Sequence, residues 1–355
     1  MKRKGVLALM LTSAMLMLSV AGCSGNKPVA TENGTSSGKG TSASSNQVYA
    51  IIAKNTGNPY NQAETQGFQD AVKEFGGKSI VRAPEQPTAE GQITIINQLI
   101  AQKVASIAIA SNDANALEPV LQKAMSAGIK VLSCDSAVNP ASRMVHVDQA
   151  DPVKIGQVEV QAMGKMMNYT GEFAILSATS TADNQNTWIK YMKEELKKPE
   201  YKKMRLVKIA YGDDLPDKST SETEALLQSY PKLKGIISPT TVGIAAAAKV
   251  LSDKGLAGKV YLTGLGLPSQ MITYIKSGVC PWMYLWNPID IGYITGYVSK
   301  ALVDGTITGK IGDTFTAGRL GKYTVTKAAD GGTEVLLGPP YKFDKANIDR
   351  WAKVY

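Results

Sequence analysis

The chain has 355 residues, 44% of them hydrophobic and 19% charged, and it carries a formal net charge of +9 at pH 7. With three cysteines, the chain does not depend on disulfides for its fold. It has one histidine and contains no metal-ligand spacing and no cofactor motif. The charge does not indicate nucleic-acid binding, because a single aromatic residue, Tyr201, lies within the densest basic cluster. We interpret that cluster as a solvated surface at a helix end: Lys193, Lys197, Lys198, Lys202, Lys203 and Arg205.

The first 22 residues have the features of a secretory signal peptide. Lys2, Arg3 and Lys4 precede an apolar run from Val6 to Val20, and small residues follow it. Cys23 comes directly after them, which resembles the lipobox of bacterial lipoproteins. This resemblance implies that Cys23 is lipidated and that the protein is anchored to the outer face of the cytoplasmic membrane; the alternative is a plain secretory signal. Residues 23–47 are rich in Ser, Gly, Thr and Asn, so we predict a flexible tether there.

The remaining residues alternate between short apolar runs and segments with helical spacing. In the first half this pattern predicts strands at 48–53, 79–81, 106–110 and 129–133, and helices at 61–75, 89–102 and 114–127. In the second half it predicts strands at 172–176, 205–210, 235–237, 260–263 and 282–285, and helices at 152–167, 188–196, 219–229, 244–251 and 290–302. Strands alternating with helices predict parallel sheets covered on both faces. The fold class is therefore α/β, with two doubly wound parallel-sheet lobes.

Polar residues follow the ends of the predicted strands. In open α/β sheets ligands bind beyond the carboxyl ends of the strands. This rule selects Lys54, Asn55, Asn112, Asp113 and Asp135 in the first half, and Asp183, Asn184, Gln185, Asn186, Pro239, Thr240, Thr241 and Asn287 in the second. Amides, hydroxyls, a lysine and a carboxylate suit a neutral polyol, whose hydroxyls both donate and accept hydrogen bonds. Tyr60 and Trp286 are suited to packing against its apolar C–H faces.

Other interpretations of these residues remain open. Asp113 and Asp183 also suit helix caps. Lys54 follows an apolar strand directly and needs a partner, for which Asp135 is a candidate. Cys134 and Cys280 either pair or are buried apolar groups. Ser133–Ser136 has only the remote His146 as a base, so a hydrolase triad has little support.

These segments resemble the substrate-binding proteins of sugar-type ABC importers, in the ribose-binding-like superfamily. Within it the chain most resembles autoinducer-2 receptors and rhamnose-binding proteins. The residues that carry the resemblance are Ile51–Lys54, Leu132–Ser136, Asn184–Trp188, Ile236–Thr241 and Leu285–Asn287. The resemblance implies a periplasmic-binding-protein type I fold with a three-crossing hinge. The expected lobes are 48–150 plus 281–308, and 151–280 plus 309–355.

The resemblance also implies a ligand set. Lys54, Asp135, Gln185 and Pro239 match residues that autoinducer-2 receptors use to hold their furanosyl polyol. Asn184 stands where those receptors have a second aspartate, and Thr241 where they have an alanine. The expected function is the capture of autoinducer-2 by hinge closure, with rhamnose or another monosaccharide as the alternative.

The implied partners are an ABC permease and its ATPase, with the membrane reached through the lipid anchor. A second alternative is a protein that presents its ligand to a membrane sensor kinase. An extracytoplasmic sugar enzyme is a further rival, but the strand ends offer no convincing acid–base pair. The signal peptide excludes a DNA-bound repressor of the same fold.

Overall fold

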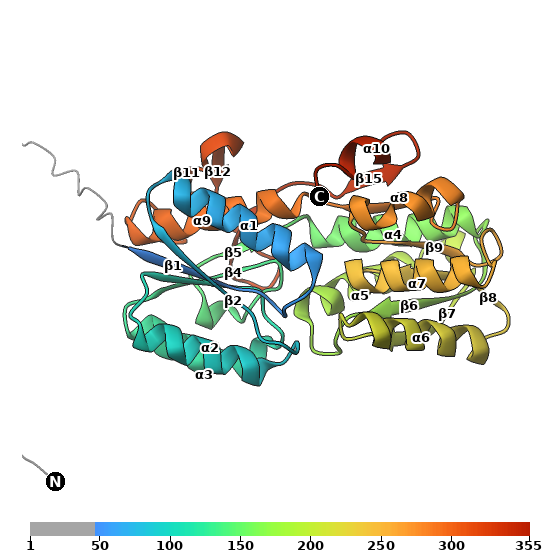
Figure 1. Cartoon of the computed structure of the whole chain (residues 1–355), viewed down its shortest axis with the longest axis horizontal. Helices are drawn as coiled ribbons and strands as arrows, with labels where there is room; N and C mark the ends of the chain where they lie inside the picture. Colours follow the sequence, from blue (N-terminus) through green and yellow to red (C-terminus); the bar gives the residue numbers. More distant parts are fainter. Residues whose placement is uncertain (1–46) are drawn as a thin grey trace, which may run out of the picture. The chain divides into compact units, whose positions relative to one another are not determined.

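The computed structural model describes residues 47–355, which belong to one compact unit (Figure 1). The predicted signal peptide, Cys23 as the predicted lipidation site and nearly all of the predicted tether fall in residues 1–46, which lie outside the described residues. Within 47–355, no helix has the length and apolar character needed to cross a membrane.

Two parallel sheets organise the described chain. The first has seven strands in the order β13-β14-β5-β4-β3-β1-β2, all parallel except the β13–β14 pair. Its strands are β1 (Val48–Ile52), β2 (Lys78–Arg82), β3 (Ser106–Ile109), β4 (Lys130–Cys134), β5 (His146–Asp148), β13 (Thr326–Lys327) and β14 (Thr333–Leu336). The second sheet has the order β7-β6-β8-β9 and is parallel throughout. Its strands are β6 (Thr170–Ser177), β7 (Lys203–Tyr211), β8 (Leu233–Ser238) and β9 (Tyr261–Gly264).

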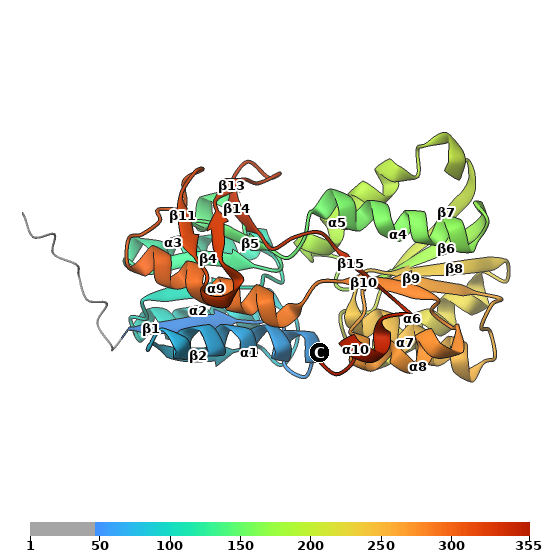
Figure 2. The same cartoon turned by 90° about the horizontal axis from the view of Figure 1, so that it is seen from above.

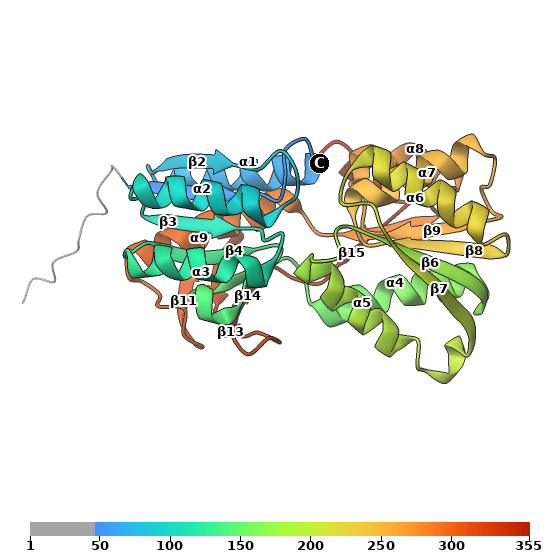
Figure 3. The ribbon, with the colours of Figure 1, turned by 90° about the horizontal axis from the view of Figure 1, so that it is seen from below.

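Helices cover both faces of the first sheet (Figures 2 and 3). They are α1 (Pro59–Glu74), α2 (Ala89–Ala101), α3 (Ala114–Ser126) and α9 (Pro288–Val303). Successive residues of a strand point to opposite faces. Along β1, Tyr49 and Ile51 therefore belong to the core under α1 and α9, whereas Ala50 and Ile52 belong to the core under α2 and α3. This double coverage explains why β1 is a continuous apolar run.

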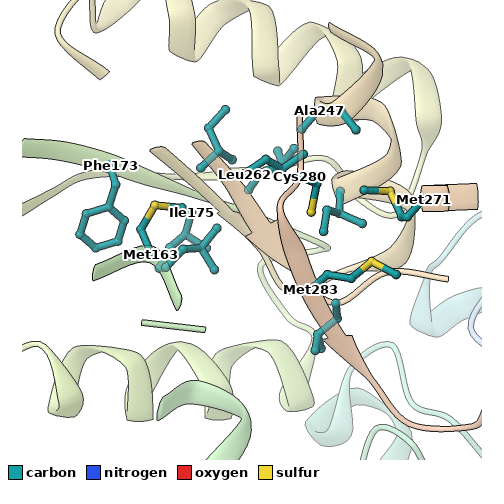
Figure 4. Packing of buried hydrophobic residues seen from close by; sticks show 14 of the residues in the cluster. Met163, Phe173, Ile175, Ala247, Leu262, Met271, Cys280 and Met283 are labelled. Carbon is teal, nitrogen blue, oxygen red and sulfur yellow. The ribbon is translucent and has the colours of Figure 1, made fainter. Parts of the chain in front are cut away.

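The second sheet is covered in the same way. Its helices are α4 (Pro152–Met166), α5 (Asp183–Glu195), α6 (Pro216–Ser229), α7 (Thr241–Asp253) and α8 (Pro268–Ser277). Figure 4 shows part of this core, where Cys280 lies among apolar side chains that include Leu262 and Met271. Cys134 and Cys280 are both buried and unpaired, so the interpretation as buried apolar groups is confirmed.

Three chain crossings join the two lobes, as expected. The chain passes from β5 to α4, from β10 (Trp282–Leu285) to α9, and from β14 to β15 (Tyr341–Asp344). The α9 helix packs against α1 in the first lobe. The smaller elements are β11 (Thr314–Thr316), which pairs with β12 (Lys322–Thr324), and the terminal helix α10 (Ile348–Trp351).

Strand pairing differs from the lobe boundaries expected from the sequence. That division placed 281–308 in the first lobe, but β10 pairs with β15 and bridges to Leu265 beside the second sheet. It placed 309–355 in the second lobe, but β14 pairs with β5 in the first sheet. The reason is that four-residue strands carry too little pattern to specify which sheet they join.

Candidate functional site

A pocket lies where the carboxyl ends of the two sheets face each other. Eight of the residues singled out for ligand binding line it: Lys54, Tyr60, Asp135, Asn184, Gln185, Pro239, Thr241 and Trp286. The lining combines apolar walls with a few convergent polar groups, as small-molecule sites do. The strand-end rule selected six of these eight residues, and Tyr60 and Trp286 were chosen as aromatic partners for a sugar ring.

Lys54 links the two lobes. It follows β1, and its ammonium group donates a hydrogen bond of 3.0 Å to Asn184 Oδ1 at the start of α5. Its Nζ also lies 3.8 Å from Asp135 Oδ2, and both side chains are buried. Asn184 Nδ2 completes the set with a 3.4 Å contact to Asp135 Oδ2. The expected Lys54–Asp135 pair is confirmed, and the Asn184 amide uses both its donor and its acceptor here.

Asp135 follows β4 and adopts the left-handed conformation, with φ of 56°. Its Oδ1 accepts a hydrogen bond of 3.1 Å from the Tyr60 hydroxyl, which itself accepts one of 2.7 Å from Trp286 Nε1. Burial raises the pKa of Asp135, while the Lys54 cation and the Tyr60 hydrogen bond oppose that rise. Tyr60 and Trp286 thus line the pocket as predicted and also form a hydrogen-bonded chain that ends at a carboxylate.

Gln185 is held between two strand ends of the second sheet. Its Nε2 donates to the Pro239 carbonyl oxygen at 2.6 Å, and its Oε1 accepts from Ser177 Oγ at 3.1 Å. Both side-chain groups of the amide are therefore oriented by the scaffold, which fixes the shape of this wall. Thr241 begins α7 beside Pro239 and places the helix N-terminus at the pocket.

Six residues selected from the sequence do not line this pocket: Asn55, Asn112, Asp113, Asp183, Asn186 and Asn287. Asp113 caps α3, where Oδ1 accepts from the backbone N–H groups of Asn115 and Ala116. Asn287 caps α9 and its Nδ2 donates to Asp290 Oδ2. Asn55 accepts from Asn61 Nδ2 through Oδ1. In Asp113, Asn287 and Asn55, neighbouring protein groups therefore use a side-chain oxygen that a ligand would need.

Asp183 lies in an adjoining pocket that shares Asp135, Asn184 and Trp188 with the first. It is the first residue of α5, whose N-cap position is Ala182, so it does not cap the helix. Burial raises the pKa of Asp183 and, more strongly, that of Asp148 in the same pocket. His146 also lines it; burial lowers the His146 pKa to about 3, so the ring stays neutral.

Sequence reasoning missed several residues of the main pocket. Asp214 follows β7 in the turn 212–215 and accepts a hydrogen bond from Thr240 Oγ1. The strand-end rule applied to the predicted strand 205–210 would have reached this turn. Trp188 and Leu265 form an apolar wall with Trp286, and the two tryptophan rings lie 5.8 Å apart. Trp188 was expected only as a helix residue.

Glu64 is a buried carboxyl group close to Asp135. It lies on α1, is fully buried, and neither carboxyl oxygen has a hydrogen-bond partner among the described residues. Burial raises the pKa of Glu64 to about 8, and the neighbouring Asp135 adds to the effect. Glu64 is therefore protonated at neutral pH, which avoids a second negative charge next to Asp135.

We expect Glu64→Gln to remove a pH dependence of folding. The folded-state pKa lies above the unfolded value of 4.5, so the folded protein retains a proton that the unfolded chain releases. Between these pKa values each pH unit upward costs about 1.4 kcal/mol of stability. Urea unfolding should show similar stability for wild type and variant at pH 5, and a more stable variant at pH 8.5.

The matched control is Glu194→Gln, since Glu194 is exposed on α5. Its stability should differ from wild type by the same amount at every pH. A Glu64→Gln variant that keeps the wild-type pH profile would show that Glu64 is already ionised in the folded protein.

The site is built for binding rather than for catalysis. It offers one ammonium group, carboxylates and amides as hydrogen-bond partners, with aromatic rings as an apolar wall. Within residues 47–355, no group of three or more His, Cys, Asp or Glu side chains is arranged to hold a metal ion. Such a set of partners can hold a polyol by its hydroxyls and its C–H faces.

Known proteins share this fold and much of this sequence. Residues 49–307 match the family model described as "Periplasmic binding protein domain". A solved ABC transporter solute-binding protein from Clostridium phytofermentas, with bound L-rhamnose, is 50% identical, and the match covers 87% of this chain and 99% of that one with a TM-score of 0.86. LsrB from Clostridium saccharobutylicum, in complex with AI-2, is 23% identical, with coverage of 86% and 99% and a TM-score of 0.81.

A curated relative is more distant. The D-ribose/D-allose-binding protein of Pseudomonas aeruginosa is 23% identical over 237 residues, which are 64% of this chain and 73% of that protein. The relatives found are solute-binding proteins and not enzymes, and the family resemblance inferred from the sequence is confirmed. The chain belongs to the periplasmic binding protein family.

Proposed function

We propose that this protein is the sugar-binding receptor of an ABC importer and that its ligand is L-rhamnose. The observation that carries the proposal is the 50% identity, over 87% of the chain, to a solute-binding protein with bound L-rhamnose. This ligand replaces autoinducer-2, which the sequence favoured, as the first candidate.

The chemistry of the pocket supports a deoxy sugar. L-Rhamnose carries hydroxyl groups on one part of its ring and a methyl group at C6. Lys54, Asp135 and Asn184 offer donors and acceptors for hydroxyls on one side of the pocket. Trp188, Trp286 and Leu265 offer an apolar wall on which a methyl group leaves no polar atom unsatisfied.

Autoinducer-2 is the second candidate. Lys54, Asp135, Gln185 and Pro239, the residues that match autoinducer-2 receptors, all line the pocket. Asn184 departs from that pattern, and its amide donates to Asp135 as well as accepting from Lys54. An aspartate there could accept from Lys54 but would repel Asp135, so the substitution changes the charge of the pocket.

Isothermal titration calorimetry of residues 47–355 should distinguish the candidates. We expect the tightest binding with L-rhamnose, and about tenfold weaker binding with L-mannose, whose extra C6 hydroxyl meets the apolar wall without a partner. Autoinducer-2 and D-ribose should bind more weakly than L-rhamnose. Tighter binding of autoinducer-2, or no heat of binding with L-rhamnose, would overturn the choice of ligand.

Transport completes the proposal. Contacts made only in the closed state drive the two lobes together around the sugar, and the closed form then docks a permease coupled to an ATPase. Lipidation of Cys23 keeps the receptor at the outer face of the membrane, since each buried methylene of an acyl chain contributes about 0.8 kcal/mol.

A further inference from the structure

We propose that Asp214 is the ligand-binding carboxylate of the second lobe and that it selects sugars able to donate hydroxyl hydrogen bonds to it. The inference rests on the proposed function, namely that the pocket holds a sugar. No residue in the set that resembles the autoinducer-2 receptors corresponds to Asp214, and the second aspartate expected from that set is Asn184 here.

A constrained turn, residues 212–215, carries Asp214 at the pocket. Asp213 and Asp214 have φ values of 54° and 53°, so two successive residues are in the left-handed backbone conformation. Residues other than glycine rarely adopt this conformation. The surrounding turn is tied down, because Gly212 N donates to Ser177 O at 2.9 Å and Leu215 N donates to Gly212 O at 3.0 Å. Such conformations persist only where neighbouring structure enforces them, and they concentrate at functional sites.

The Asp214 carboxylate has acceptor capacity left for a ligand. The side chain lines the pocket and is only 9% exposed. The only hydrogen bond it receives from the described residues comes from Thr240 Oγ1 to Oδ1, and no cation within 47–355 forms an ion pair with it. An ionised carboxylate has about four acceptor positions, so Oδ2 is left for donors such as sugar hydroxyls.

Asp214 also completes a pattern of charge across the pocket. Asp135 comes from the first lobe and Asp214 from the second, and the charge of Asp214 contributes to raising the pKa of Asp135. Lys54 is the cation that pairs with Asp135. A sugar whose hydroxyl groups donate hydrogen bonds to both carboxylates connects the two lobes. A ligand without those hydroxyl groups leaves both negative charges without a donor from the ligand.

The neighbouring residue provides a matched control. Asp213 has the same side chain and nearly the same φ, but it pairs with Lys218 and does not line the pocket. Asparagine is tolerated in the left-handed region and retains an oxygen for Thr240. Asp214→Asn and Asp213→Asn therefore remove the same charge from the same turn, and differ in whether the side chain reaches the ligand.

Calorimetry with L-rhamnose as the probe tests the inference. Asp214→Asn should raise the Kd by about 10- to 100-fold, because hydrogen bonds to a charged acceptor are about twice as strong as neutral ones. Asp213→Asn should stay within twofold of wild type. Monodeoxy analogues of L-rhamnose give a second measurement that does not depend on the stability of the variant. The loss of affinity on removing the hydroxyl that Asp214 accepts should be smaller in Asp214→Asn than in wild type.

The outcomes separate this inference from the proposed function. If wild-type protein binds L-rhamnose, an Asp214→Asn Kd within twofold of wild type overturns the inference alone, as does an unchanged profile across the deoxy analogues. If wild-type protein binds none of L-rhamnose, L-mannose, D-ribose and autoinducer-2, the proposed function fails and the inference fails with it.

Discussion

Lys54→Met is expected to weaken sugar binding by about 100-fold or more, since removing one partner of a buried, hydrogen-bonded charge pair costs about 2–5 kcal/mol. Lys54 is the cation of the pair with Asp135 and the donor to Asn184, so one side chain connects both lobes. Methionine has a similar length but no charge. Without the ammonium group the pKa of Asp135 rises further, and a protonated Asp135 loses acceptor strength for a sugar hydroxyl. Calorimetry with L-rhamnose at pH 7.5 measures the effect.

Lys249→Met is the matched control. Lys249 pairs with Asp253 four residues later on α7, and both side chains are exposed. Exposed pairs of this kind contribute about 0.3–0.5 kcal/mol to stability, so neither the fold nor the affinity should change measurably. A Lys54→Met variant that keeps its circular dichroism spectrum and binds within threefold of wild type would contradict the role given to Lys54.

The strand-end residues were predictable because their positions follow from sheet geometry. Parallel strands that alternate with helices bring their carboxyl ends to one edge of the sheet. Lys54 after β1 and Asp135 after β4 therefore lie on the same edge, with β3 between their strands, whatever the length of chain between them. Pro239 after β8 and Gln185 at the start of α5 meet for the same reason in the second sheet.

The distinction between ligand contacts and helix caps was not predictable. A polar residue between a strand and a helix can bind a ligand or satisfy the N-terminal N–H groups of the helix. Asp113 and Asn287 do the second, whereas the Asn184 side chain lines the pocket. The choice depends on the backbone angles of one or two residues, and these are set by packing rather than by the local sequence. Asp214 was missed for a different reason: the strand-end rule was not applied to the predicted strand 205–210, which the turn 212–215 follows.

The contact between α1 and α9 could not be predicted from the sequence either. It depends on glycines, and the pattern of apolar residues gives no information about them. A Cβ atom added at Gly292 would lie 1.7 Å from the carbonyl oxygen of Glu64, and one added at Gly67 would lie 1.9 Å from that of Ile289. The two backbones therefore touch. α1 carries Tyr60 and α9 begins just after Trp286, so this contact also sets the Tyr60–Trp286 hydrogen bond in the pocket.

Gly292→Ala should destabilise the protein by about 3 kcal/mol or more, because the obstacle is backbone, which cannot rotate away as a side chain can. Urea unfolding measures the loss. Gly338→Ala is the matched control, since a Cβ there meets no atom within 4 Å. Sugar affinity should also fall in Gly292→Ala, since separating α9 from α1 moves Trp286 away from Tyr60. A Gly292→Ala variant as stable as Gly338→Ala would show that the helices can separate at little cost, and that the glycines do not hold Tyr60 against Trp286.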